Sequence, residues 1–158
     1  MIDASTILKQ LATHGVEYAI VGGLAAAIYG NNRATFDIDL VIAVSKENLG
    51  RFANAINPLN PRLRPNGPTI VLDDKPLGGR FSRIYTDHGV IDVFTELPGV
   101  PTAQLLYNAV STSFGDVSIR VASLDDLIAM KEAANRDHDR TDAENLRFIR
   151  DQFGVNPD

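Results

Sequence analysis

The chain has 158 residues, of which 44% are hydrophobic and 22% are charged, fractions that are typical of a globular domain and argue against extensive disorder. Its 15 basic and 20 acidic residues give a net charge of −5, which excludes a generally basic nucleic-acid-binding surface but not a local basic cleft. Cysteine is absent, which excludes disulfide frameworks, thiolate zinc sites and a cysteine nucleophile.

The first third of the chain predicts alternating helices and strands. Helices are expected over residues 3–14, 24–29 and 46–56, and strands over residues 17–21 and 37–44. Asp3 or Ser5 is placed to cap the first helix, and Gly15 is placed to end it. The aromatic residues expected to fill the core are Tyr18, Tyr29 and Phe36.

Residues 58–79 differ in character, because five of the eight prolines fall there. Regular structure is not expected in this segment, apart from a short strand over residues 69–72. The remaining elements are a hairpin of residues 80–86 and 90–94, helices over residues 102–109, 123–135 and 139–153, and a strand over residues 117–121. Ser123 and Asp126 fit a capping box at the start of the 123–135 helix.

This order of elements predicts a single α/β (α+β) domain over residues 1–158, in which helices flank a mixed, twisted sheet. The N-terminus lacks the pattern of a signal peptide, and no apolar run approaches the roughly 18 residues of a membrane span. We therefore expect a soluble, cytoplasmic protein without a membrane partner.

Two acidic residues stand in an otherwise apolar strand, which reads DIDLVIAV from Asp37. Residues two apart on a strand project from the same face, so Asp37 and Asp39 lie side by side. Buried there without a partner, the two carboxylates would repel each other and lose hydration. A divalent cation between them would remove that cost, because carboxylate oxygens suit magnesium. The alternative is a solvated edge face of the sheet.

A third acidic residue, Asp92, interrupts the apolar run VIDVF. If this strand pairs beside the strand of Asp37 and Asp39, the three carboxylates form one pocket. Such a pocket is suited to hold two metal ions roughly 3.5–4 Å apart around a phosphoryl-transfer centre. Gly22 and Gly23, placed between a strand and a helix, would expose backbone N–H groups to phosphates there. An ordinary tight turn is the alternative for the two glycines.

The run VGGLAAAIYGNNRATFDIDLVI, followed by VIDVF, resembles the signature of the nucleotidyltransferase superfamily with the polymerase-β-type fold. With DLIAMKEAANRDHDRTD further along, the chain is most similar to the AbiEii-type, toxin-like nucleotidyltransferases. The resemblance implies transfer of a nucleoside monophosphate from an NTP, with Mg²⁺ (two ions, or Mn²⁺ instead) held by the catalytic residues Asp37, Asp39 and Asp92.

The resemblance also implies nucleotide binding by Gly22, Gly23, Arg33 and Lys131. Lys131 falls within the apolar stripe of its helix, formed by Leu124, Leu127, Ile128 and Ala134, so it meets anions or extends its amine out to solvent. Arg33 contacts phosphate or acceptor, or else lies on a surface loop. For Arg136, Asp139 and Asp142, which match a pattern that ends these domains, we favour simple ion pairs at helical spacing.

The acceptor of the nucleotide is open: a tRNA, a protein or a small hydroxylated molecule. The locally basic residues 58–83 would contact a nucleic-acid acceptor, unless they form an ordinary surface loop with solvated arginines. A partner protein or a second copy of the chain is a further candidate for completing the site. The alternative function is a non-catalytic binding or antitoxin module that keeps the fold.

Overall fold

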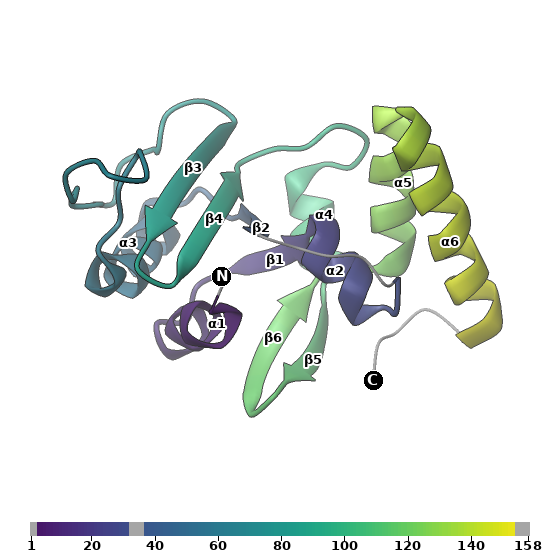
Figure 1. Cartoon of the computed structure of the whole chain (residues 1–158), viewed down its shortest axis with the longest axis horizontal. Coiled ribbons are helices and arrows are strands. Elements are labelled where there is room, and N and C mark those ends of the chain that lie inside the picture. Colours follow the sequence, from purple (N-terminus) through teal and green to yellow (C-terminus); the bar gives the residue numbers. More distant parts are fainter. Residues whose placement is uncertain (1–2, 32–36, 154–158) are drawn as a thin grey trace.

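The computed structural model describes residues 3–31 and 37–153 of the chain. These residues form a six-stranded sheet with strand order β3-β4-β2-β1-β6-β5 (Figure 1). The strands are β1 (Tyr18–Val21), β2 (Asp37–Ile42), β3 (Phe81–Thr86), β4 (Gly89–Phe94), β5 (Val110–Phe114) and β6 (Val117–Val121). The pairs β2/β4 and β1/β6 are parallel, and the other three are antiparallel. The predicted α/β fold with a mixed sheet is thereby confirmed.

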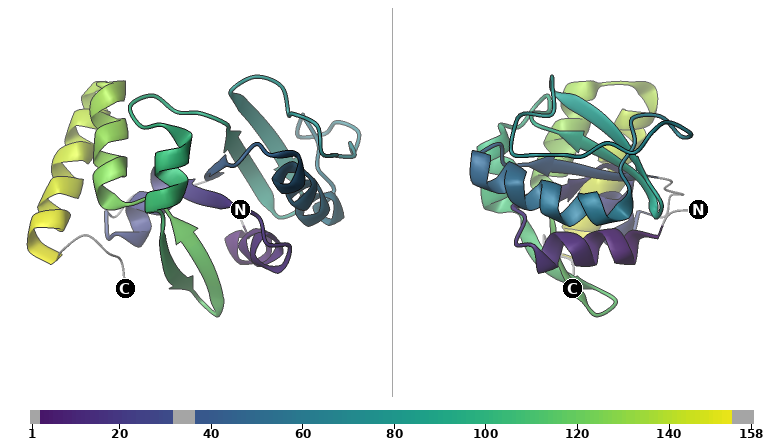
Figure 2. Two further views of the ribbon diagram at one scale, coloured as in Figure 1. Left: turned by 180° about the vertical axis from the view of Figure 1, so that it is seen from behind. Right: turned by 90° about the vertical axis from the view of Figure 1, so that its left-hand side faces the viewer.

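Helices lie on both sides of this sheet. They are α1 (Ala4–Thr13), α2 (Gly22–Ile28), α3 (Lys46–Ile56), α4 (Thr102–Asn108), α5 (Leu124–Ala134) and α6 (Asp137–Phe153), with a 3₁₀ turn η1 (Asn57–Leu59). The helices α1 and α3 lie side by side (Figure 2), whereas α5 and α6 pack on each other at the opposite end of the molecule (Figure 1). Within the described ranges, no helix combines the length and apolarity needed to cross a membrane.

Side-chain caps fix where the principal helices begin. The Asp3 carboxylate accepts a hydrogen bond from the Thr6 N–H, so α1 begins at the expected place. The Ser123 hydroxyl accepts from the Asp126 N–H in the same way and starts α5. The Asp126 carboxylate does not complete the expected capping box, because it is engaged by amide groups of α4. At the other end of α5, Asn135 adopts a left-handed conformation and ends the helix.

The core is centred on β2, because both faces of this strand are covered. Ile38 and Leu40 on one face and Val41 on the other are completely buried. Tyr18 and Tyr29 are buried as predicted, whereas Phe36 lies outside the described residues.

Two local predictions differ from the structure. Residues 69–72 are not a strand: the Ile70 N–H bonds the Pro61 carbonyl and the Leu72 N–H bonds the Asn57 side chain, while Val71 is 84% exposed. The nearby prolines lack the N–H donors that a continuous ladder needs. Conversely, β5 was not predicted, because its Val-Ser-Thr-Ser-Phe sequence is largely polar and it pairs only with β6 at the sheet edge.

Candidate active site

The sheet brings the three predicted carboxylates to one face. In the parallel pair of β2 and β4, Asp39 lies directly opposite Asp92. Asp37 precedes Asp39 by two residues on the same strand and therefore projects from the same side. Asp92 is buried, whereas Asp37 and Asp39 are partly exposed. Residues that are far apart in the sequence thus meet at the centre of the sheet.

Gly22 closes one side of this group. It follows Val21, which lies opposite Asp39 in the antiparallel pair of β1 and β2. Its φ of +68° is a left-handed conformation, and a Cβ atom at this position would lie 2.0 Å from Asp39 Oδ2. Glycine is therefore required for both backbone conformation and space. The next residue, Gly23, lies in the first turn of α2.

Arg83 joins the three carboxylates, and we call these four residues the carboxylate cluster. Arg83 on β3 lies opposite Asp92 in the hairpin. Its Nε and Nη2 atoms donate to the two oxygens of Asp92 at 2.8 and 3.0 Å, and Nη2 reaches Asp37 Oδ2 at 3.3 Å. Sequence reasoning placed Arg83 only in a basic segment. The hairpin register is the signal that identifies it, but the expected turn of residues 87–89 would set Ile84 across from Asp92. The two-residue turn of the structure, residues 87–88, sets Arg83 there instead.

The carboxylate cluster carries more negative than positive charge. Burial raises the pKa of Asp39 to about 7, and the neighbouring charges of Asp92 and Asp37 add to that effect, which Arg83 opposes. Burial, followed by the charge of Asp92, also raises the pKa of Asp37. A cation added beside these carboxylates would therefore be strongly favoured.

A cavity of about 320 Å³ adjoins Asp39. Its lining combines the predicted residues Gly22, Asp39 and Lys131 with an apolar wall and part of the α5–α6 junction. The apolar wall is formed by Val21, Phe94, Leu97, Pro98, Leu127, Met130 and Ala134. The cavity could therefore contact an anionic part of a ligand through Lys131 and an apolar part through this wall.

Lys131, Arg136, Asp139 and Asp142 form a second group, the lysine cluster. Lys131 Nζ lies 3.4 Å from Asp139 Oδ1 and 3.3 Å from Asp142 Oδ2. Arg136 Nε lies 2.6 Å from Asp139 Oδ2, as expected for an i,i+3 ion pair. The hydrogen bond from Arg136 and the nearby charge of Lys131 lower the pKa of Asp139 to about 2, although burial opposes them. The ion pairs therefore extend beyond the predicted helical spacing and hold Lys131 at the cavity.

The predicted stripe of α5 is correct in part. Leu124, Leu127 and Ile128 are buried, but Ala134 is exposed near the end of the helix. Lys131 has a side chain that is 22% exposed and lies at the margin of the stripe. Of the other predicted nucleotide-binding residues, Arg33 lies outside the described residues.

The basic segment 58–83 is largely neutralised by local ion pairs. Arg62 Nη1 lies 2.8 Å from Asp87 Oδ1, and Arg80 Nε lies 2.5 Å from Glu96 Oε1. Arg83 is engaged in the carboxylate cluster. The segment therefore provides less positive charge for a nucleic-acid acceptor than its sequence suggested.

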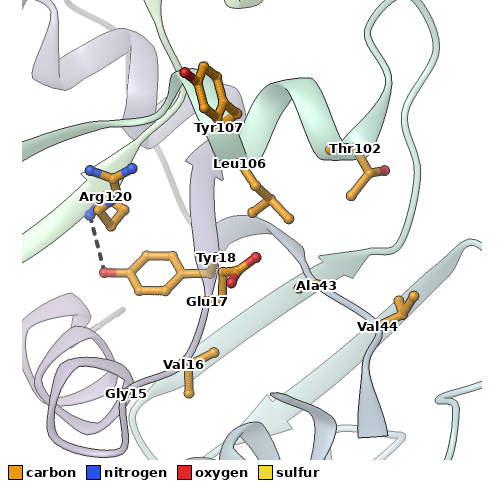
Figure 3. Close-up of a pocket in the computed structure, with 11 residues that line it drawn as sticks. Gly15, Val16, Glu17, Tyr18, Ala43, Val44, Thr102, Leu106, Tyr107 and Arg120 are labelled. Carbon is orange, nitrogen blue, oxygen red and sulfur yellow. Dashed lines mark hydrogen bonds between the residues drawn. The ribbon is translucent and has the colours of Figure 1, made fainter. Parts of the chain in front are cut away.

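A larger hollow of about 940 Å³ lies at the other end of β1 (Figure 3). It is bordered by Glu17, Tyr18, Leu106, Tyr107 and Arg120, and the Tyr18 hydroxyl accepts a hydrogen bond from the Arg120 N–H at 3.3 Å. None of the predicted site residues lines it. The predicted residues Gly22, Asp39 and Lys131 line the smaller cavity instead.

The carboxylate cluster does not present a preassembled metal site. Within residues 3–31 and 37–153, no three His, Cys, Asp or Glu side chains converge closely enough to hold an ion. The three carboxylates share one face, but Arg83 occupies the space beside Asp92 and Asp37.

Comparison with solved structures shows the same fold in several nucleotidyltransferases. The lincosamide antibiotic adenylyltransferase LnuA, solved with lincomycin bound, is 13% identical with a TM-score of 0.62, over 94% of this chain and 98% of that one. A putative nucleotidyltransferase from Thermotoga maritima is 15% identical with a TM-score of 0.56, over 96% of both chains. The antibiotic-resistance factor ANT(2'')-Ia is 16% identical with a TM-score of 0.55, over 95% of this chain and 88% of that one.

A search of curated proteins gives no match. The family model described as the nucleotidyl transferase AbiEii toxin of type IV toxin–antitoxin systems, in contrast, matches residues 6–153, almost the whole chain. Together with the shared fold, this match shows that the chain belongs to the AbiEii family of nucleotidyltransferases.

Proposed function

We propose that the protein transfers a nucleoside monophosphate from an NTP to a hydroxyl group of an acceptor, in a reaction that depends on a divalent metal ion. The observation that carries this proposal is the register that sets Asp39 against Asp92, with Gly22 closing on Asp39. The family membership supports the same reaction class. The whole of residues 1–158 then acts as one catalytic domain, in the cytoplasm.

The donor set of the carboxylate cluster fits a hard divalent cation. Asp37, Asp39 and Asp92 supply only carboxylate oxygens, the ligands that Mg²⁺ prefers. Burial, followed by the charges of Asp92 and Asp37, raises the pKa of Asp39. This supports the same assignment, because a bound cation would stabilise the ionised carboxylate. Mg²⁺ or Mn²⁺, as two ions, would lower the pKa of the attacking hydroxyl and hold the pyrophosphate that leaves.

The triphosphate lies, in this proposal, between α2 and α5. Gly22 and Gly23 offer backbone N–H groups without side chains that would block close approach. Lys131 contributes its amine from the opposite wall of the cavity, where Asp139 and Asp142 hold it in place. We assign Arg33, which precedes the acidic strand, to phosphate or acceptor contact on the basis of its sequence alone.

The acceptor is a tRNA, a protein or a small molecule. Structures of the same fold include a lincosamide antibiotic adenylyltransferase and an antibiotic-resistance factor, whereas the family description names a toxin. A partner protein or a second copy of the chain would supply additional acceptor contacts.

One observation favours a second function. Arg83 already neutralises Asp92, which is what a non-catalytic binding or antitoxin module would retain after losing the need for a metal. The presence of all three carboxylates favours the enzyme instead.

The experiment that separates the two functions is a transfer assay. The protein is incubated with each NTP labelled at the α-phosphate, Mg²⁺ and a total lysate, beside Asp39→Ala and the control Asp116→Ala, whose residue lies in the exposed β5–β6 turn. We expect label in RNA, protein or small molecules with the wild type and the control, and a loss of roughly a thousandfold with Asp39→Ala. Transfer that persists in Asp39→Ala, or no transfer and no NTP binding by the wild type, would contradict the proposed enzyme.

A further inference from the structure

We propose that Arg83 is a built-in counter-cation that occupies Asp92 and Asp37 until a divalent ion replaces it, and that Arg83 thereby sets the metal affinity of the site. This inference rests on the proposed metal-dependent function and adds to it a residue that controls when the site is filled.

The geometry of Arg83 is that of a competitor rather than of a distant neighbour. Both oxygens of Asp92 accept from the same guanidinium, at 2.8 and 3.0 Å, and the Asp92 side chain is only 8% exposed. The same Nη2 atom reaches Asp37 at 3.3 Å. A bidentate arginine–carboxylate pair of this kind is among the stronger polar contacts in proteins. An ion entering between Asp39 and Asp92 would therefore meet a fixed positive charge beside its ligands.

The position of Arg83 also allows it to leave. Its side chain is 46% exposed, so the guanidinium can turn into solvent without being transferred through the core. Asp92, in contrast, stays buried on β4 and would remain without its cation. Such an uncompensated buried carboxylate is strongly destabilising, which means that Arg83 leaves only when another cation arrives. Exchange of one cation for another is thus the step that the arrangement favours.

The register of β2 and β4 sets the three carboxylates on one face, yet they form no preassembled metal site among the described residues. Arg83 explains this difference. Asp92 is oriented toward β3 by the guanidinium, and Asp37 is drawn to the same group. Asp92 already contacts the side chains of Asp39 and Asp37, so removal of Arg83 would make the oxygens that it occupies available to an ion. Without Arg83, all three carboxylates would attract a bound ion, and no arginine would compete with it.

The test measures Mn²⁺ binding directly, by electron paramagnetic resonance of free Mn²⁺, at pH 8 and without nucleotide. The proteins are the wild type, Arg83→Gln, Arg83→Lys and the control Arg150→Gln, which removes an arginine that pairs with Asp125 on the surface of the helical pair. We expect Arg83→Gln to bind Mn²⁺ roughly tenfold more tightly or better, the scale on which groups next to a metal site alter affinity. Arg83→Lys should fall between the wild type and Arg83→Gln, and Arg150→Gln should match the wild type.

A second readout is thermal unfolding in EDTA and in Mn²⁺. Arg83→Gln should melt at a lower temperature than the wild type in EDTA and gain more from Mn²⁺ than the wild type does. If Arg83→Gln does not fold in EDTA, Arg83→Lys decides the question, because it keeps the charge but loses the bidentate fork.

The outcomes separate this inference from the proposed function. Mn²⁺ binding that depends on Asp39 but is unchanged or weakened in both Arg83 variants would overturn the role of Arg83 and leave the metal site standing. Absence of Asp39-dependent Mn²⁺ binding in every variant, Arg83→Gln included, would overturn the metal site itself.

Discussion

Two groups of charged residues meet the same cavity and differ in how their negative charge is balanced. The carboxylate cluster has three acids and one arginine, and burial raises the pKa of Asp39 to about 7. The lysine cluster has two acids and two bases, and its cations lower the pKa of Asp139 to about 2. The first group therefore favours an additional cation, whereas the second is already neutral. This difference supports the proposal that the carboxylate cluster binds a cation and that the lysine cluster positions Lys131.

After the loss expected for Asp39→Ala, the largest effect should come from crowding the carboxylate cluster through Gly22→Ala. The added Cβ would lie 2.0 Å from Asp39 Oδ2 and would force a left-handed backbone onto alanine. We expect nucleotide transfer to fall roughly a hundredfold, the scale of a displacement of about 1 Å at a reacting group. Unfolding free energy should fall by roughly 1–3 kcal/mol from the backbone strain alone. Transfer rate and urea denaturation measure the two effects.

Gly115→Ala is the matched control for this variant. Gly115 has a similar φ of +63°, but no atom lies within 4 Å of its added Cβ. The control should lose stability by roughly 1–2 kcal/mol, as a left-handed alanine does, and keep full transfer activity. Equal loss of transfer in both variants would show that strain, not crowding of Asp39, is responsible.

Asp39→Asn tests the charge imbalance of the carboxylate cluster through the pH dependence of protein stability. Because the pKa of Asp39 is higher in the folded protein than in the unfolded chain, the folded state takes up the additional proton between roughly pH 4 and 7. Without metal, wild-type stability should therefore fall as the pH rises through this window. Asp39→Asn should remove much of that fall and be more stable at pH 8 by roughly 1.5–3 kcal/mol, since each pKa unit corresponds to about 1.4 kcal/mol.

Urea denaturation in EDTA at pH 5, 6 and 8 measures this effect, with Asp116→Asn as the control on the exposed turn. An Asp39→Asn protein that is less stable than the wild type at pH 8 would refute the account of burial and repulsion. The control should follow the wild type at each pH.

Asp139→Asn should have the smallest effect on stability. It should destabilise the protein, whereas Asp39→Asn should stabilise it. The pKa of Asp139 is lower in the folded protein, so its contribution is fully present above roughly pH 4 and is lost as the pH falls toward 2. At pH 7 the variant should be less stable by roughly 1–2 kcal/mol, within the range of a hydrogen bond to a charged group. The difference from the wild type should shrink at pH 3. A difference that is constant down to pH 3 would exclude this ion-pair origin.

Much of the fold was accessible from the sequence because local signals agreed with the global structure. The helix over residues 46–56 begins and ends where its pattern predicted, since Ser45 caps it. The strand of Asp37 and Asp39 and the hairpin of residues 80–94 were also predicted, although its turn has two residues rather than the expected three. The prediction of a strand over residues 69–72 was wrong, because an apolar run forms a strand only if a neighbouring strand pairs with it.

The candidate site was accessible only in part. The positions of Asp37, Asp39 and Asp92 on one face follow from alternation along strands, provided that β2 and β4 are neighbours. Which strands are neighbours is a property of the whole sheet, and the local pattern does not contain it. Ion pairs between elements, such as that of Lys131 with Asp142, depend on how α5 packs on α6 and were missed for that reason.

The tight turn at residues 87–88 limits which length changes the hairpin tolerates. A single inserted residue there would shift β3 by one position against β4 and turn Arg83 to the other side of the sheet. The irregular connection of residues 63–79, by contrast, takes no part in strand pairing and can absorb insertions at small entropic cost. Natural or engineered length variation should therefore collect in that long connection and avoid the short turn.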